Sequence, residues 1–308
     1  MSEVTDARRV TSTTSPTLGE IWSQNRNAVL GFLAVTIALV VVTFYRSFKD
    51  IYHHWNLPES LYSHALLIPP ISLFFVWRLR ASLRTTEVAP SPWGYLVLGM
   101  GCCMLLLGDF LGFMTVVHLS LLPVLTGLCL IFLGSAQVQK LWFPLGFLFF
   151  MIPMPYSLTS GISFQSKMIA TESAVAIGQF LTLHMVQDGS YVYLGTEDRL
   201  LVGDVCGGMR SLVALLAFGA LMAYVSKTTW WAKLLILLVS PAIAILANVT
   251  RIFFLCVVGY VWGSETATGL VHDISGIGIF AVAFALLFSA EAILRKIAPQ
   301  RDEGESKS

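Results

Sequence analysis

Charged side chains are scarce in this sequence, and their scarcity excludes most water-soluble folds. Only 12% of the 308 residues are Asp, Glu, Lys or Arg, whereas a soluble domain carries roughly 25%. Hydrophobic residues make up 56% of the chain. We therefore predict an integral membrane protein. The formal net charge of +1 gives no indication of nucleic-acid binding, so no nucleic-acid partner is expected.

Motifs of metal-dependent and nucleotide-dependent chemistry are also missing. The sequence contains no HExxH, no paired Cys/His metal spacing, no P-loop and no GxSxG. We therefore predict neither a metal nor a cofactor. Four of the five cysteines lie inside apolar runs without a second polar ligand, and we expect them to pack as small hydrophobic residues: Cys102, Cys103, Cys129 and Cys256.

Long apolar runs, separated by short polar stretches, predict an all-α polytopic membrane protein. Most of these runs have roughly the 17–25 residues that a helix needs to cross a bilayer. The seventh run is long enough to tilt, or to be broken near Asn248. We predict about eight transmembrane helices, at approximately 28–46, 61–79, 93–111, 115–134, 141–155, 206–225, 232–262 and 270–291.

The two ends of the chain are polar. We expect residues 1–27 and 297–308 to be disordered cytoplasmic tails that flank a transmembrane domain over 28–296. Lys and Arg residues are more frequent in the loops on the side of the termini than in the opposite loops, which places both termini in the cytoplasm. The first apolar run is long enough to span the membrane, so we predict no cleavable signal peptide.

The longest stretch outside the predicted spans is 156–205. Residues 160–183 mix apolar positions with polar ones such as Lys167 and Thr171, which predicts an amphipathic helix at the outer membrane interface. Residues 189–202 alternate in polarity around a Gly-Thr-Glu-Asp turn and predict a short β-hairpin. This region either caps the site and grips an extended substrate peptide, or is an interfacial connector.

Cys206 is the most informative residue, in the string GDVCGGMRSL that opens the sixth predicted span. A thiol at a helix N-terminus meets the positive end of the helix dipole, which favours the nucleophilic thiolate. Gly207 and Gly208 leave backbone N–H groups accessible to a developing oxyanion. Arg210 is either part of this site or the partner of a carboxylate, and Asp204 is a candidate supporting residue. The alternative is a purely structural cysteine.

Two later spans carry ionisable residues at the same predicted depth. Arg251 lies 17 residues after Leu234, about 26 Å along a helix that starts inside, and His272 begins the last span from the outer side. Ionisable groups inside a membrane are unfavourable and often functional. Arg251 either stabilises an oxyanion or extends toward lipid headgroups. His272 is either a general base beside Cys206 or an interfacial histidine, and Asn248 is a further supporting candidate.

Several segments of the sequence form a combination typical of one family. They are Cys206-Gly207-Gly208-Met209-Arg210-Ser211-Leu212, Asn248-Val249-Thr250-Arg251, His272 with Gly276, Tyr62-Ser63-His64 followed by Ile68-Pro69, and Phe143-Pro144 through Pro153-Met154-Pro155. This combination resembles the exosortase/archaeosortase family, whose members are polytopic cysteine transpeptidases or proteases. The resemblance covers about residues 50–290. A histidine in place of a second arginine favours the bacterial exosortase branch, and a glycine stands at 207 where the family usually has Ser or Ala.

The resemblance implies a function, a location and partners. Family members act on secreted proteins that end in a tripartite tail of short motif, apolar helix and basic end, and the exosortase motif is Pro-Glu-Pro-like (PEP-CTERM). We therefore expect a protease or transpeptidase of the cytoplasmic membrane, with its active site at the outer face and with such secreted proteins and membrane lipids as partners. Cys206 is then the nucleophile, His272 carries protons, Arg251 stabilises the oxyanion and His64 faces the substrate.

One alternative to an enzyme stays open at this point. In this alternative, the chain is a non-catalytic membrane component of exopolysaccharide assembly or export. Arg251 and His272 then line a polar pathway, and Cys206 has no chemical role.

Overall fold

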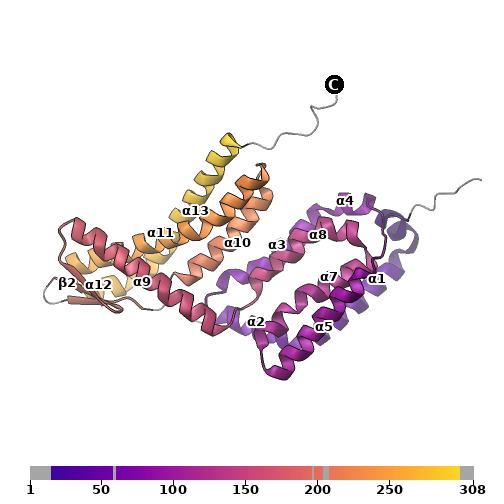
Figure 1. Cartoon of the computed structure of the whole chain (residues 1–308), viewed down its shortest axis with the longest axis horizontal. Helices are drawn as coiled ribbons and strands as arrows, with labels where there is room; N and C mark the ends of the chain where they lie inside the picture. Colours follow the sequence, from indigo (N-terminus) through magenta and orange to yellow (C-terminus); the bar gives the residue numbers. More distant parts are fainter. Residues whose placement is uncertain (1–14, 58–59, 196–197, 204–207, 299–308) are drawn as a thin grey trace, which may run out of the picture. The chain divides into compact units, whose positions relative to one another are not determined.

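The computed structural model describes residues 15–57, 60–195, 198–203 and 208–298 (Figure 1). The chain divides into two compact units. Unit 1 comprises Met1–Asp50 and Pro69–Phe149, and unit 2 comprises Ile51–Ile68 and Phe150–Ser308. Helix α2 (Tyr45–Asn56) and the 3-10 helix η2 (Leu148–Met151) run across the boundaries between them.

Unit 1 is built from helices, in agreement with the predicted all-α class. Their bounds are α1 Leu18–Thr43, α3 Ile68–Arg78, α4 Arg80–Thr85, α5 Trp93–Leu111, α6 Met114–Leu119, α7 Leu121–Phe132 and α8 Ser135–Phe147. Helix α1 begins ten residues earlier than the predicted span, so residues 18–27 are helical and not part of a disordered tail. The cause is a capping box, in which Thr17 Oγ1 accepts from the Glu20 N–H and Glu20 Oε2 accepts from the Thr17 N–H.

Glycines seven residues apart bring α5 and α7 into close contact. Gly94, Gly101 and Gly108 are buried on one face of α5. A Cβ atom added at Gly101 would lie only 2.9 Å from the backbone nitrogen of Val124 on α7. Helices in a membrane pack best where small residues let their backbones approach, because lipid supplies no hydrophobic force between them. The glycine face of α5 is therefore the seam that joins it to α7.

The predicted span 61–79 is shorter than expected as an α-helix. Residues Ser63–Leu67 form the 3-10 helix η1, and α3 has only 11 residues. Pro69 and Pro70 have no N–H to donate, so they fit the first turn of an α-helix but not its interior. The α-helix therefore starts at Ile68, and the tighter 3-10 turn precedes it.

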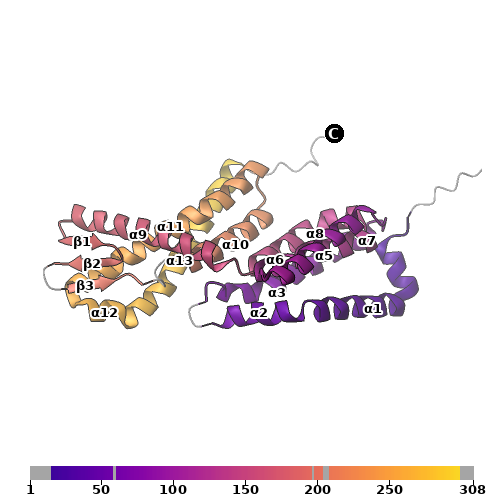
Figure 2. The same cartoon turned by 60° about the horizontal axis from the view of Figure 1, so that its bottom comes forward.

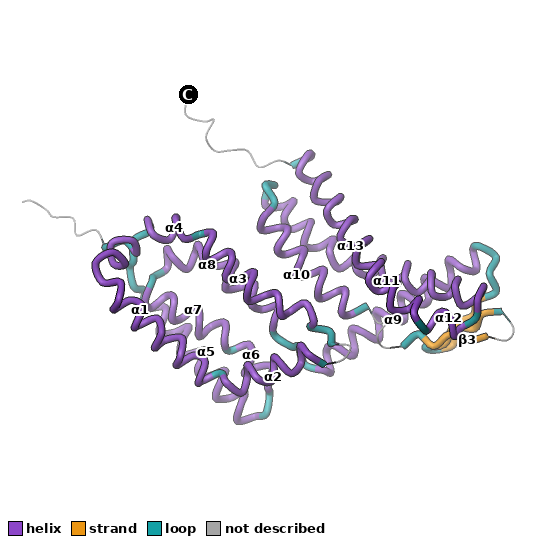
Figure 3. The backbone as a smooth tube through the Cα atoms, turned by 180° about the vertical axis from the view of Figure 1, so that it is seen from behind, coloured by secondary structure: helices purple, strands orange, loops and turns teal. Residues whose placement is uncertain are grey.

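Unit 2 contains the long helices of the C-terminal half and a small sheet. Its elements are α9 Tyr156–Phe180, β1 Met185–Asp188, β2 Tyr191–Leu194, β3 Asp198–Leu201, α10 Met209–Val225, α11 Trp230–Trp262, α12 Ser264–Thr268 and α13 Leu270–Ile297. Figure 3 shows α10, α11 and α13 side by side. Helix α11 runs unbroken through Asn248, so the break considered near that residue does not occur.

Helix α11 is the centre of unit 2, because it contributes to both of its apolar clusters. One cluster joins α9, the sheet and α11, and it includes Ala174, Val192 and Ile252. The other joins α10, α11 and α13, and it includes Leu215 and Leu287. The C-terminal half of α11 therefore packs with α9 and the sheet, and its N-terminal half packs with α10 and α13.

The described helices include five that are long and apolar enough to cross a membrane. These are Leu18–Thr43, Trp93–Leu111, Met114–Phe132, Trp230–Trp262 and Ile274–Ile297. A sixth would be formed by Ser135–Met151 together with Tyr156–Phe180, which meet at an angle of 81°. The predicted count of about eight also included α3 and α10, which are apolar but shorter than 18 residues.

The stretch after this bend differs in detail from its prediction. The helix expected at 160–183 is present as α9, which begins four residues earlier and ends three residues earlier. Its buried face includes the polar residues Lys167 and Thr171. The expected hairpin is present as β2 and β3, and β1 extends it to a three-stranded antiparallel sheet (Figure 2). Strand β1 was missed because its four residues, Met-Val-Gln-Asp, show neither clear alternation nor a run of β-branched side chains.

Candidate active site

The glycine that begins α10 lies directly against α11. Cys206, Asp204 and Gly207 are outside the described residues, and the structure resumes at Gly208. Gly208 has a φ of +71°, and a Cβ atom added to it would lie 2.8 Å from Nδ2 of Asn248. A residue with a side chain would be strained by this φ and would also displace the Asn248 amide. The start of α10 therefore requires glycine at this position.

Asn248 sits in the middle of α11 with its side chain almost fully enclosed. Its exposed fraction is 4%. Arg251 follows three residues later, so the two side chains lie on neighbouring positions of the same helix face. Asn248 lies against Gly208 at the start of α10, one helical turn before Arg251.

Arg251 reaches across to α13. Its Nε donates a hydrogen bond to Oγ of Ser275 at 3.4 Å. A Cβ atom added at Gly276 would lie 3.7 Å from Nη2 of Arg251, so the guanidinium lies close over a helix backbone without a side chain in between. Arg251 is thus partly buried against α13.

His272 lies on the first turn of α13, three residues before Ser275. Its side chain is outside what the structure describes, and its backbone is one helical turn from the contact with Arg251. Ser275 itself was not singled out from the sequence. The available signal was its spacing of three residues from His272, which puts both on one face of a helix.

Arg210 lies in the first turn of α10, two residues after Gly208. Its Nε is buried, and within the described ranges no hydrogen-bond acceptor is within reach of this atom. The alternative of a salt bridge to a carboxylate is not realised with any described residue. A guanidinium N–H therefore lies near the start of α10 with no hydrogen-bond acceptor among the described residues.

Comparison with protein-family models gives one match over most of the chain. The model described as transmembrane exosortase (Exosortase_EpsH) matches residues 54–289. The chain belongs to the transmembrane exosortase family. Every candidate site residue falls inside the matched range. Comparison with curated proteins and with solved structures gives no match. Family membership makes this chain a multi-pass membrane protein and implies a role in processing sorting signals.

In this exosortase, residues near His64 in the sequence are hydrogen-bonded to the segment that precedes α9. It lies in η1, and both of its ring nitrogens are buried without a hydrogen-bond partner among the described residues. The neighbouring Tyr62 accepts a hydrogen bond from the Met154 N–H at 2.9 Å, and Trp55 Nε1 donates to the Met151 carbonyl at 3.1 Å.

Two other histidines of the exosortase, His118 and His184, have different surroundings. His118 is buried in unit 1 with Nε2 3.2 Å from Oδ2 of Asp50. His184 is exposed between α9 and β1. The described contacts of Gly208 and Arg251 connect the start of α10, α11 and α13.

The small sheet packs on the part of α11 that follows Arg251. A Cβ atom added at Gly259 would lie 2.7 Å from Cδ1 of Leu194, which shows how closely β2 approaches the helix. Gly259 is two helical turns beyond Arg251, about 12 Å along the axis. Tyr191 and Tyr193 on β2 are each 39% exposed. The sheet thus presents two accessible aromatic side chains beyond the site, toward the C-terminal end of α11.

Proposed function

We propose that this exosortase is a membrane-embedded cysteine protease or transpeptidase. It cleaves PEP-CTERM-like sorting signals at the C-termini of secreted proteins through a thioacyl-enzyme. The observation that supports this proposal is that α10, α11 and α13 meet. Gly208, directly before α10, lies against Asn248 of α11. Arg251 of α11 lies against Ser275 and Gly276 of α13. Motifs that are 24 to 68 residues apart in the sequence are thereby joined by contacts in one unit.

The position of Cys206 in the sequence ties the nucleophile to this arrangement. Two peptide units separate its Cα from that of Gly208, so covalent geometry limits the distance between these atoms to about 7 Å. A thiol near the start of α10 also meets the positive end of the helix dipole, which favours the thiolate. We infer that Cys206 acts within reach of Asn248 and Arg251.

The chemical step follows ordinary thiol acyl transfer. The Cys206 thiolate attacks the substrate's peptide carbonyl, and a C–S bond forms while the carbonyl oxygen becomes an oxyanion. The C–N bond then breaks, and the leaving amine takes a proton from His272. Water or an external amine attacks the thioester, gives its proton to His272 and releases the Cys206 thiolate.

Arg251 is the proposed donor to the oxyanion. Ser275 and Gly276 fix its guanidinium on α13, so little reorganisation is needed when the negative charge develops. Asn248 and the backbone N–H groups of Gly207 and Gly208 are supporting groups, and Asp204 is a further candidate. Loss of one such donor lowers the rate by about 100-fold to 1,000-fold in other enzymes.

Arg210 and His64 are the proposed substrate-binding groups. The Nε of Arg210 is buried with no acceptor among the described residues, and an unpaired buried N–H is unfavourable by about 1–3 kcal/mol, so this atom is suited to an oxygen of the bound sorting motif. The two buried ring nitrogens of His64 can likewise form hydrogen bonds with the bound sorting motif, one as donor and one as acceptor.

The proposed orientation places both termini in the cytoplasm and the site at the outer face of the cytoplasmic membrane. It is supported by the bias of Lys and Arg toward the loops on the side of the termini. The apolar helix of a substrate tail then lies beside the transmembrane helices, while its motif emerges at the outer interface. Protease access to a tag at either terminus in spheroplasts tests this orientation, and cleavage of both tags from outside would contradict it.

The test is a gel-shift assay in cells that co-express a tail-bearing substrate. We expect wild type and Cys102→Ala to convert the substrate to its shorter form, and Cys206→Ala to leave it uncleaved. Cys102 is a suitable control because it is an exposed thiol on α5, in the other unit. Equal conversion by Cys206→Ala, in protein that reaches the membrane normally, overturns the enzymatic proposal and favours a non-catalytic role in exopolysaccharide assembly or export.

A further inference from the structure

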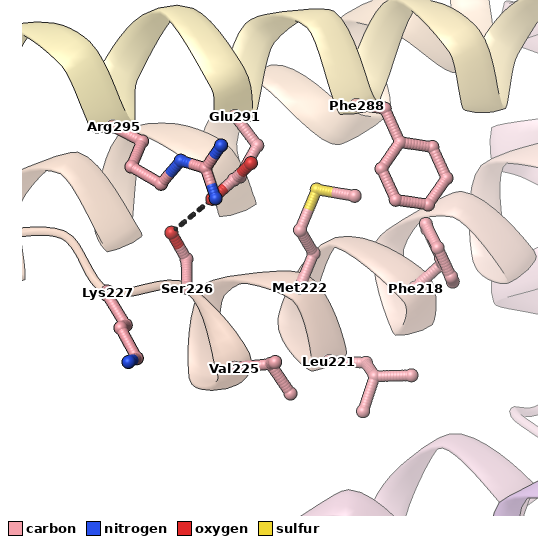
Figure 4. Close-up of a pocket in the computed structure, with 9 residues that line it drawn as sticks. All are labelled: Phe218, Leu221, Met222, Val225, Ser226, Lys227, Phe288, Glu291 and Arg295. Carbon is pink, nitrogen blue, oxygen red and sulfur yellow. Dashed lines mark hydrogen bonds between the residues drawn. The ribbon is translucent and has the colours of Figure 1, made fainter.

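A cavity of about 410 Å³ lies between α10 and α13, near the ends of these helices that are farthest from Gly208 (Figure 4). Helix α10 has 17 residues and is therefore about 26 Å long. The proposed catalytic site is at one end of this length and the cavity is at the other. Because the hydrocarbon core is about 30 Å thick, the proposed location of the catalytic site at the outer face would place the cavity in the inner leaflet of the membrane.

The inner wall of the cavity is apolar. Phe218 and Met222 of α10 lie on the side of Phe288 of α13 (Figure 4), and Leu221 also lines the cavity. The rings of Phe218 and Phe288 are edge to face, with centroids 5.6 Å apart. Ligand pockets typically have volumes of about 300–1,000 Å³ and mainly apolar walls, and this cavity meets both conditions. The wall suits a hydrocarbon chain.

The rim of the cavity is charged. Lys227 follows α10, Arg295 lies in the last turn of α13, and both side chains are exposed. Among the residues that the structure describes, neither cation is in an ion pair. Glu291 is held by a hydrogen bond from Ser226 Oγ to its Oε1 at 2.7 Å (Figure 4). The rim therefore combines two cations with one oriented carboxylate.

We propose that this cavity binds an anionic glycerophospholipid whose headgroup carries hydroxyl groups, as in phosphatidylglycerol. The phosphate binds to Lys227 and Arg295, the headgroup hydroxyls donate to Glu291, and one acyl chain lies along the apolar wall. Charge decides between this lipid and the basic end of a substrate tail, because the two rim cations repel a basic peptide and attract a phosphate.

Lipid binding to the purified full-length protein, without substrate, tests this proposal independently of catalysis. Native mass spectrometry in detergent is used to titrate dioleoylphosphatidylglycerol and, separately, dioleoylphosphatidylcholine. We expect the double variant Lys227→Gln/Arg295→Gln to bind phosphatidylglycerol about 30-fold more weakly than wild type. The double variant Lys233→Gln/Lys296→Gln is the control, because it removes two cations that do not line the cavity. We expect it to bind as wild type does.

A second variant keeps the test decisive if the charge changes impair folding. Leu221→Trp leaves every charge in place and fills the apolar wall, and we expect it to weaken phosphatidylglycerol binding at least tenfold. Equal binding of phosphatidylglycerol and phosphatidylcholine to wild type overturns the proposal. So does an equal loss in the two double variants, or unchanged binding by Leu221→Trp. Competition by inorganic phosphate at millimolar concentration would show a site for the free anion and would also overturn it.

Discussion

At the scale of single residues, Gly208 is the position where the proposed site tolerates least change. Its φ of +71° costs a residue with a side chain about 1–2 kcal/mol, and a new Cβ would lie 2.8 Å from the Asn248 amide. We predict that Gly208→Ala lowers the rate of substrate processing by at least tenfold. The measurement is a time course of the gel-shift assay at matched enzyme levels.

Gly161→Ala is the control for this substitution. Gly161 lies on α9 in the same unit, and an added Cβ would have no neighbour within 4 Å. Its processing rate is expected to stay within twofold of wild type. A wild-type rate in Gly208→Ala would mean that the contact between α10 and Asn248 has no part in the reaction.

The residues of the site differ in how far the sequence predicts them. Arg251 could be predicted, because an arginine far inside an apolar run is unfavourable unless other groups hold it. Its partner Ser275 could not, since serines are common in membrane helices and only the contact across two helices distinguishes this one. The roles of Cys206 and His272 stay predictions, because the thiol and the imidazole lie outside the described part of the chain.

At the scale of elements, the close approach of α5 and α7 gives a stability prediction. A side chain at Gly101 would meet Val124, including its backbone nitrogen at 2.9 Å, which cannot move aside as a flexible side chain can. Overpacking typically destabilises a protein by about 1–3 kcal/mol, and contact with backbone places this case at the upper end. We predict that Gly101→Leu lowers the midpoint of thermal unfolding by several degrees.

A second glycine on the same helix provides the comparison. Gly99 has no atom within 4 Å of an added Cβ, so Gly99→Leu should leave the unfolding midpoint near that of wild type. Both changes add the same side chain to the middle of α5, and hydrophobicity and helix propensity therefore cancel between them. Equal midpoints for the two variants, measured by differential scanning fluorimetry in detergent, would contradict the proposed seam.

Helix boundaries were predictable where the sequence marks them with residues that stop a helix. The span predicted at 93–111 agrees with α5, which Pro92 precedes and Gly112 ends with a φ of +75°. The span at 61–79 fails as one α-helix because Pro69 and Pro70 interrupt its first half. Apolar composition alone does not reveal this difference, since both stretches are equally suited to lipid.

At the scale of the whole molecule, the candidate site belongs entirely to unit 2. Helices α10, α11 and α13 meet there through the contacts of Gly208 and Arg251. Counting loop charges and helix lengths predicted that distant motifs reach a common depth. The contacts of Asn248 and Arg251 show that these helices are neighbours, which no count along the sequence can show.

The most direct test of the account is to isolate the covalent intermediate. The enzyme is mixed with a tail-bearing substrate, quenched in acid and digested, and the peptide that contains Cys206 is analysed by mass spectrometry. A thioacyl-enzyme predicts an adduct on Cys206 that corresponds to the acyl part of the cleaved substrate, equal to the released acid less one water, and its loss on treatment with hydroxylamine. Turnover of the substrate with no adduct on Cys206, and with full activity in Cys206→Ala, would contradict the account.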